Sequence, residues 1–152
     1  MSAIIQRMAR SRRFFEDLDE YHGCHDEEVF GLAPLGVGFL RRKQRYATGS
    51  TPAKVILKLA TYLLAPVCTR GKAMPCPLCG ERVTTEIDGE EIVLGSAEIR
   101  ILGDENIYAA PDLILHFITE HNYRPPQEFI DVVRKGVGVD SAEHRALIKA
   151  LN

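Results

Sequence analysis

Two short stretches decide how this chain folds: Cys76-Pro77-Leu78-Cys79-Gly80, and residues 107–121, which end in the pair His116 and His121. Two residues separate the cysteines, four separate the histidines, and 36 residues lie between the two pairs. Thiolate sulfur and imidazole nitrogen are the usual ligands of structural zinc, which takes four of them in a tetrahedron. The spacing therefore predicts one zinc site, with the ligands Cys76, Cys79, His116 and His121.

The predicted site requires a tight turn and a helix that ends at the right place. Gly80 suits the turn, because such a turn often needs a residue with positive φ. Residues 107–121 read as a helix opened by Pro111. Five helical steps rotate by about 140°, so a regular helix would not direct both imidazoles at one ion. We therefore expect the helix to loosen or end near His121, and Asn122 and the prolines that follow favour an end there.

Between the two pairs, the sequence predicts strands. Residues 82–87 and 91–94 flank Asp88-Gly89, a dipeptide favoured in tight hairpins. Residues 97–102 alternate apolar and charged positions and form a candidate third strand. We therefore predict an α+β fold, in which a small antiparallel sheet of two or three strands with a zinc knuckle packs among about five helices.

A cysteine knuckle followed by a histidine helix resembles the two-Cys, two-His zinc finger. The resemblance covers about residues 74–123 and implies one structural Zn²⁺ per chain, although such fingers usually have about a dozen residues between the pairs. The longer insert here departs from the DNA-reading form of the finger. The whole chain also resembles small uncharacterised bacterial proteins with a Tyr-Ala-Ala-Pro…His…His-x-Tyr-x-Pro-Pro segment, a likeness that implies no particular activity.

Two other interpretations of the same residues stay open. Cys-x-x-Cys is also the motif of dithiol redox enzymes, although there it usually opens a helix after a strand, whereas a glycine and a β-rich run follow here. The histidines could also be ordinary core or surface residues. A site with four protein ligands leaves no open position for water or substrate, which favours a structural ion over a catalytic one. No catalytic residues are predicted.

Composition and length indicate an ordinary globular protein, with 152 residues, 45% hydrophobic residues and a net charge of −2. We expect one domain over residues 1–152, with a mainly helical part at 1–73, the zinc-binding module at 74–123 and C-terminal helices at 124–152. The first residues lack a secretory pattern, and the longest apolar window, 59–67, is too short to span a membrane. We therefore expect a cytoplasmic location, no membrane contact and reduced cysteines.

Positive charge is concentrated in the first half of the chain. Residues 1–75 carry 12 Lys and Arg against 7 Asp and Glu, whereas residues 76–152 carry 7 against 14. The cations gather in residues 7–13, within a helix expected at 3–18, and in residues 41–54. Both segments could bind nucleic acid, with phosphate contacts from 7–13 and with phosphate contacts and base stacking from 41–54, or the second could pair with the acidic half. The residues concerned are Arg41, Arg42, Lys43, Arg45 and Tyr46.

His22, Cys24 and His25 crowd together in an acidic, glycine-containing segment. They could ligate a second metal or provide a Cys/His nucleophile pair oriented by Asp26, or their proximity could be coincidental. A metal there would need further ligands from elsewhere in the chain. Cys68, the remaining cysteine, is expected to pack as a small free thiol.

Three further helices are predicted. The first runs over residues 52–65 with Ser50 or Thr51 as its cap, the second over 127–135, and the third over 142–151 with Asp140 or Ser141 as its cap.

The function predicted from the sequence is that of a structural-zinc protein acting through protein contacts, of a regulatory or adaptor type. The alternatives are a nucleic-acid-binding protein and an enzyme that uses zinc or a Cys/His pair.

Overall fold

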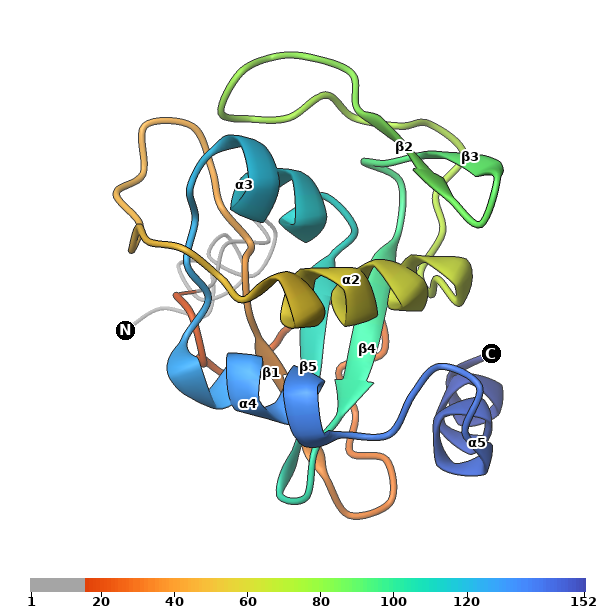
Figure 1. Cartoon of the computed structure of the whole chain (residues 1–152). Coiled ribbons are helices and arrows are strands. Elements are labelled where there is room, and N and C mark those ends of the chain that lie inside the picture. The colour runs from red at the N-terminus through yellow and green to blue at the C-terminus, as the bar shows by residue number, and fades with distance from the viewer. Residues whose placement is uncertain (1–15) are drawn as a thin grey trace, which may run out of the picture.

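The computed structural model describes residues 16–152. Residues 1–15 lie outside the described part, and with them the basic segment 7–13 and most of the helix expected at 3–18. Residues 16–19 are not helical. In chain order the elements are β1 (Ala33–Gly36), α2 (Ala53–Thr61), the 3₁₀ turn η1 (Tyr62–Leu64), β2 (Thr84–Ile87), β3 (Glu90–Val93), β4 (Glu98–Leu102), β5 (Asn106–Pro111), α3 (Ile114–Glu120), α4 (Gln127–Lys135) and α5 (Ala142–Leu151). The predicted α+β class is confirmed (Figure 1).

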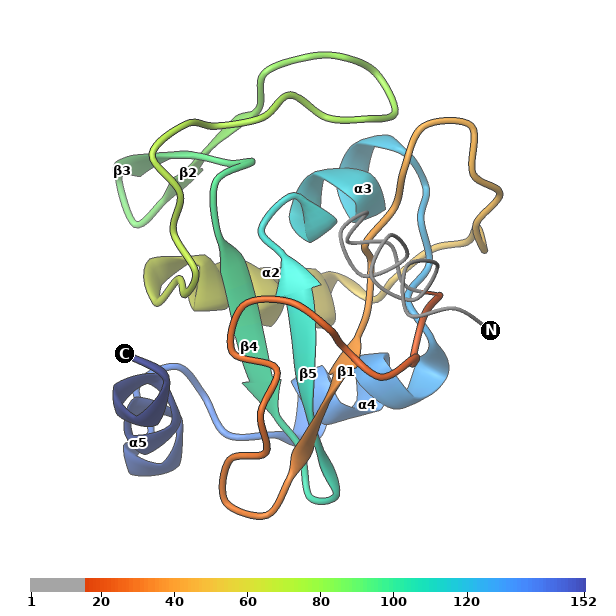
Figure 2. The same cartoon turned by 180° about the vertical axis from the view of Figure 1, so that it is seen from behind.

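A three-stranded sheet lies at the centre of the described structure. Strand β5 is its middle strand, paired in parallel with β1 and antiparallel with β4. Helices α2 and α4 cover one face (Figure 1), and residues 17–32 cross the opposite face (Figure 2). Both faces of β4 are therefore buried: Ile99 and Ile101 are 0% exposed, and Arg100 is 1% exposed.

The hairpin forms where the sequence predicts it, but it makes a sheet of its own. Strands β2 and β3 pair only with each other, and Asp88 and Gly89 connect them with φ values of 51° and 78°. The candidate third strand, as β4, pairs instead with β5. The central sheet is consequently mixed, because it includes the parallel pair β1–β5.

The prediction that Pro111 opens a helix is wrong. Residues 106–111 form β5, of which Pro111 is the last residue, and α3 begins at Ile114. The four residues from Ile107 to Ala110 are buried between two partner strands. Pairing on both sides satisfies the backbone of this segment, and this tertiary arrangement overrides its helix-like apolar pattern.

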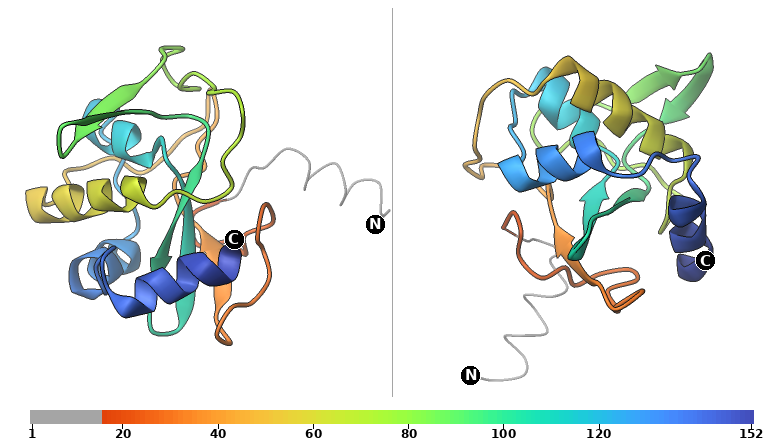
Figure 3. Two further views of the ribbon diagram at one scale, coloured as in Figure 1. Left: turned by 90° about the vertical axis from the view of Figure 1, so that its right-hand side faces the viewer. Right: turned by 60° about the horizontal axis from the view of Figure 1, so that its bottom comes forward.

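The remaining helices follow the sequence closely. Helices α4 and α5 have the predicted bounds, and the Ser141 side chain caps α5 by accepting a hydrogen bond from the His144 N–H at 3.1 Å. Helix α2 has no side-chain cap, contrary to prediction; it follows Pro52, and the hydroxyl of Thr51 is buried without a partner. Helix α5 contacts β4 (Figure 3). Within residues 16–152, no helix has the length and apolar character needed to cross a lipid bilayer.

Candidate metal centre

The cysteine pair lies on a tight turn between η1 and the hairpin. The N–H of Gly80 donates to the carbonyl of Cys76 at 2.8 Å and closes the turn, and Gly80 has the predicted positive φ of 76°. The N–H of Leu78 points back to the Cys76 sulfur at 3.3 Å. The turn thus directs backbone dipoles at one sulfur, which favours the thiolate that a metal requires.

The histidine pair spans α3, from its first turn to the residue after its last turn. His116 is within the helix, which ends at Glu120, while His121 has left the helical conformation with φ −119° and ψ 12°. Asn122 follows with φ 54°. The expectation that the helix ends near His121 is confirmed. This change of direction lets two side chains five residues apart face each other, with their rings 4.9 Å apart.

The four side chains form one compact cluster. The Cys76 Sγ lies 3.6 Å from the His121 Nε2, the Cys79 Sγ lies 3.6 Å from the His116 Nε2, and the two Nε2 atoms are 3.2 Å apart. All four atoms lie within 4.8 Å of one another. Zinc at about 2.3 Å from sulfur and about 2.05 Å from nitrogen would need tetrahedral edges of about 3.6 Å for N–S and about 3.3 Å for N–N. The observed distances of 3.6, 3.6 and 3.2 Å match these edges.

Burial acts in opposite directions on the metal-binding forms of the two residue types, because it favours neutral imidazole and disfavours thiolate. Burial, together with the nearby His121, lowers the pKa of His116 and favours its neutral, ligating form. Burial raises the pKa of the Cys76 thiol, and N–H groups of Cys79 and Leu78 oppose that rise. Two ring nitrogens and two sulfurs facing one space bring their lone pairs together, and a thiophilic divalent metal ion would satisfy all four. The cluster could therefore hold a metal ion.

A loop far away in sequence supports the His121 end of the cluster. The Tyr46 hydroxyl donates to the carbonyl of His121 at 3.0 Å, and its ring packs edge-on against Tyr123 with centroids 6.0 Å apart. Backbone hydrogen bonds from Gly49 to Asn122 and from Arg124 to Ala47 also join this loop to the residues that follow α3. The sequence suggested that Tyr46 could stack on a base, and in the fold it makes these contacts with His121 and Tyr123. No local signal could have revealed a partner 75 residues away.

Asp112 holds the N-terminal start of α3 in place. Its carboxylate is 4% exposed and accepts hydrogen bonds from the N–H groups of Gly95 at 2.8 Å and Ala97 at 3.2 Å. Burial raises the pKa of Asp112 to about 6, and the N–H donors oppose that rise. Because these contacts join the end of the hairpin to the start of the histidine helix, Asp112 helps to hold the two halves of the cluster together.

The other basic candidates lie on an exposed loop. The N–H of Arg41 donates to the Gln44 side chain at 2.9 Å, which closes a turn. The side chains of Arg41, Arg42, Lys43 and Arg45 are exposed. The structure therefore places these four cations at the surface, whereas Tyr46 is half-buried.

In the segment with His22, Cys24 and His25, the fold brings a further cysteine, Cys68, beside Cys24 and His25. Cys24 is joined by a disulfide to Cys68, so Cys68 is not the free thiol that the sequence suggested. The potential ligand group there contains Cys24, His25 and Cys68. His22 lies outside it, with its Nε2 3.9 Å from the Glu20 carboxylate. The fold brings Cys68 to this site, and the spacing along the chain did not indicate it.

Comparison with known proteins gives a family and no activity. Residues 13–134 match a family described as a domain of unknown function, DUF7919. The matched range contains the four residues of the Cys/His cluster and the Cys24–Cys68 disulfide, and it stops before α5. No curated protein and no solved structure matches the chain.

Proposed function

The chain belongs to the DUF7919 family, and we propose that it is a structural-zinc protein that acts through contacts with other proteins. The zinc would be held by Cys76, Cys79, His116 and His121. The observation that carries this proposal is the agreement of the three ligand–ligand distances with the edges of a zinc tetrahedron. Four protein ligands fill that tetrahedron, so the ion would cross-link the fold and would not activate water.

The position of the cluster explains why a cross-link would matter. The chain between η1 and β2, which carries both cysteines, contains no helix or strand of its own. The two-stranded sheet that follows does not pair with the central sheet. An ion bound between this region and α3 would reduce the conformational freedom of both, so that its binding energy becomes folding energy.

Exposed apolar side chains beside the cysteine turn support a role in protein contacts. Met74 is 55% exposed and Val93 is 52% exposed, although both belong to large apolar residue types. The Met74 N–H donates to the Gly95 carbonyl at 3.0 Å, which places Met74 near the end of β3, where Val93 lies. Exposed apolar patches are typical of interaction surfaces, and these two residues mark where we expect one.

The proposal is tested by metal analysis of the purified chain. We expect one zinc per chain, and Co²⁺ substitution should give the absorption of a tetrahedral site with two thiolates. Cys79→Ala and His121→Ala should lose the metal, whereas His22→Ala, a histidine outside the cluster, should retain it. Metal-free parent protein that stays folded and does not bind Co²⁺ would contradict the proposal.

A second candidate function is nucleic-acid binding, favoured by the exposed cations Arg42, Lys43 and Arg45. Phosphate contacts depend strongly on salt, because binding releases counterions. If this loop binds a nucleic acid, affinity should fall steeply between low and moderate salt, and Arg42→Ala combined with Arg45→Ala should reduce the slope. Absence of binding at low ionic strength would eliminate this candidate.

A further inference from the structure

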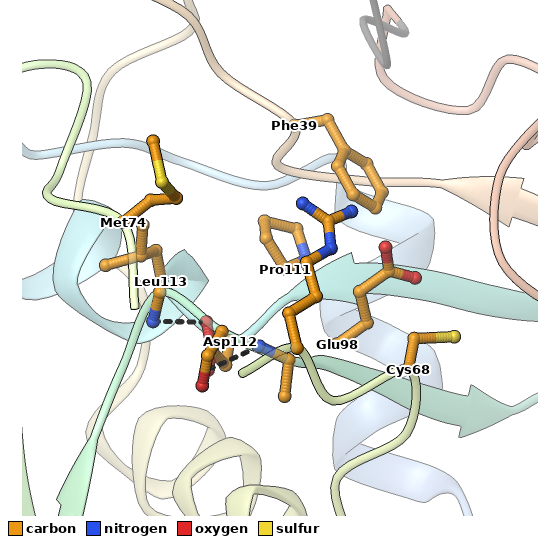
Figure 4. A pocket seen from close by; sticks show the side chains of 11 residues that line it. Phe39, Cys68, Met74, Glu98, Pro111, Asp112 and Leu113 are labelled. Atoms are coloured by element: carbon orange, nitrogen blue, oxygen red, sulfur yellow. Dashed lines mark hydrogen bonds between the residues drawn. The ribbon is translucent and has the colours of Figure 1, made fainter. Parts of the chain in front are cut away.

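A second sulfur site lies on the face of the central sheet that residues 17–32 cross. The Cys24–Cys68 disulfide joins residues 44 positions apart, with Cα atoms separated by 6.0 Å. Neither cysteine is buried, and Cys68 lines an open cavity of about 190 Å³. Figure 4 shows Cys68, Glu98 and Phe39 on one side of this cavity and Met74 and Leu113 on the other. In Figure 4 the Cys68 sulfur points away from Met74 and Leu113, so access to the disulfide depends on the partial exposure of both cysteines.

The buried guanidinium of Arg100 lies next to the disulfide. Arg100 is 1% exposed, and its Nη2 donates to the Cys24 carbonyl at 2.7 Å and lies 3.8 Å from the Cys68 sulfur. Its Nη1 is held by Glu98 at 2.9 Å, and its guanidinium lies 4.9 Å from the centre of the Tyr21 ring. These contacts fix the guanidinium in place. A positive charge beside a cysteine favours its thiolate and makes it a better leaving group.

A proton donor and acceptor completes the group. His25 is exposed, and one of its ring nitrogens lies within 4.8 Å of both sulfurs. Imidazole exchanges protons readily near neutral pH. His25 and Cys68 also both have left-handed backbones, with φ values of 58° and 55°. For residues other than glycine this conformation is costly, and it concentrates at functional sites.

We propose that Cys24–Cys68 is a reversible thiol–disulfide exchange site that reacts with external thiols at its partly exposed cysteines. An external thiolate attacks the Cys24 sulfur, the disulfide bond breaks, and its electron pair leaves on Cys68 as a thiolate beside Arg100. A second external thiolate attacks the outer sulfur of the mixed disulfide and releases Cys24, which takes a proton from His25 or water. Two external thiols are oxidised to one disulfide, and the protein disulfide is reduced to two thiols.

This proposal does not depend on the Cys/His cluster, with which it shares no residue. The test equilibrates the full-length, metal-loaded chain with mixtures of reduced and oxidised glutathione, blocks thiols with an alkylating agent, and assigns each cysteine by peptide mass spectrometry. We expect Cys24 and Cys68 to change state together and reversibly, with the chain still folded by circular dichroism. A disulfide that stays oxidised in a large excess of reduced glutathione would overturn the proposal.

The role of Arg100 is tested by the alkylation of the reduced protein at pH 6. Cys68 should react at least tenfold faster than Cys24, Arg100→Lys should keep much of this preference, and Arg100→Met should abolish it. Because Arg100 is buried and its variants could misfold, His25→Ala at the surface provides a second measurement: exchange should slow severalfold while the equilibrium stays unchanged. Equal reactivity of the two thiols in the parent, or uptake of a second zinc by the reduced parent, would overturn the exchange assignment.

Discussion

The two sulfur sites of this protein differ in where their positive charge comes from. The Cys76/Cys79 turn faces two imidazoles, of which His116 is driven toward its neutral form. The Cys24/Cys68 pair faces the guanidinium of Arg100, which the fold buries and fixes. Thiolates at the first site therefore need a cation from solution, whereas the second site has one built in. Two pairs of cysteines in one chain thus support different chemistry because of their neighbours.

Removal of the metal should give the largest effect and should act on the first site alone. A chelator at neutral pH is expected to lower the free energy of unfolding by several kcal/mol, since zinc binding contributes on the order of 10 kcal/mol in finger peptides. Urea unfolding followed by circular dichroism measures the change, and the Cys24–Cys68 disulfide should stay oxidised. Unchanged urea unfolding after complete metal removal would show that the cluster does not stabilise the fold.

Reduction of the disulfide should act on the second site alone. Opening a loop with a sequence separation of 44 residues is expected to lower the free energy of unfolding by about 4 kcal/mol. Urea unfolding in a phosphine reductant measures the change, and the double variant Cys24→Ser with Cys68→Ser should unfold similarly. The metal content should stay the same in both cases, and loss of metal on reduction would mean that the two sites are coupled.

Asp112 lines the same cavity as Cys68 and also fixes the start of the histidine helix. An acid whose pKa rises on folding binds its proton more tightly when folded, so the free energy of unfolding falls as pH rises from 3.8 to about 6. At about 1.4 kcal/mol per pH unit, the loss is about 3 kcal/mol. Asp112→Asn should remove this contribution, so its stability relative to the parent should rise between pH 4 and pH 7. A difference independent of pH would contradict this prediction.

Loss of the Tyr46 hydroxyl should give the smallest effect. Tyr46→Phe removes the hydrogen bond to His121 and is expected to lower the free energy of unfolding by about 1 kcal/mol. It should also weaken metal binding severalfold, as measured by competition with a chromogenic chelator. The matched control is Tyr108→Phe, which loses a hydrogen bond to Glu128 away from the cluster. The control should lose similar stability and keep the parent's metal affinity, and equal affinities in the two variants would contradict a supporting role for Tyr46.

Local patterns account for the parts of the structure that were predicted well. The Asp88-Gly89 turn, the bounds of α4 and α5, and the end of α3 near His121 all follow from turn, cap and periodicity signals. Strand β5 was missed because its apolar run has no local feature that distinguishes a buried strand from a buried helix. The disulfide was missed because its cysteines lie 44 residues apart with no spacing signal.

The sequence by itself determined which four side chains are suited to a metal, because cysteines and histidines paired at short spacing are the usual ligands of structural zinc. Only the tertiary structure decided that the four meet with tetrahedral spacing, that Tyr46 supports His121 and that Arg100 stands behind Cys68. These contacts depend on how the sheet and the crossing segments pack. Packing arises from the burial of the whole chain, and short stretches of sequence do not encode it.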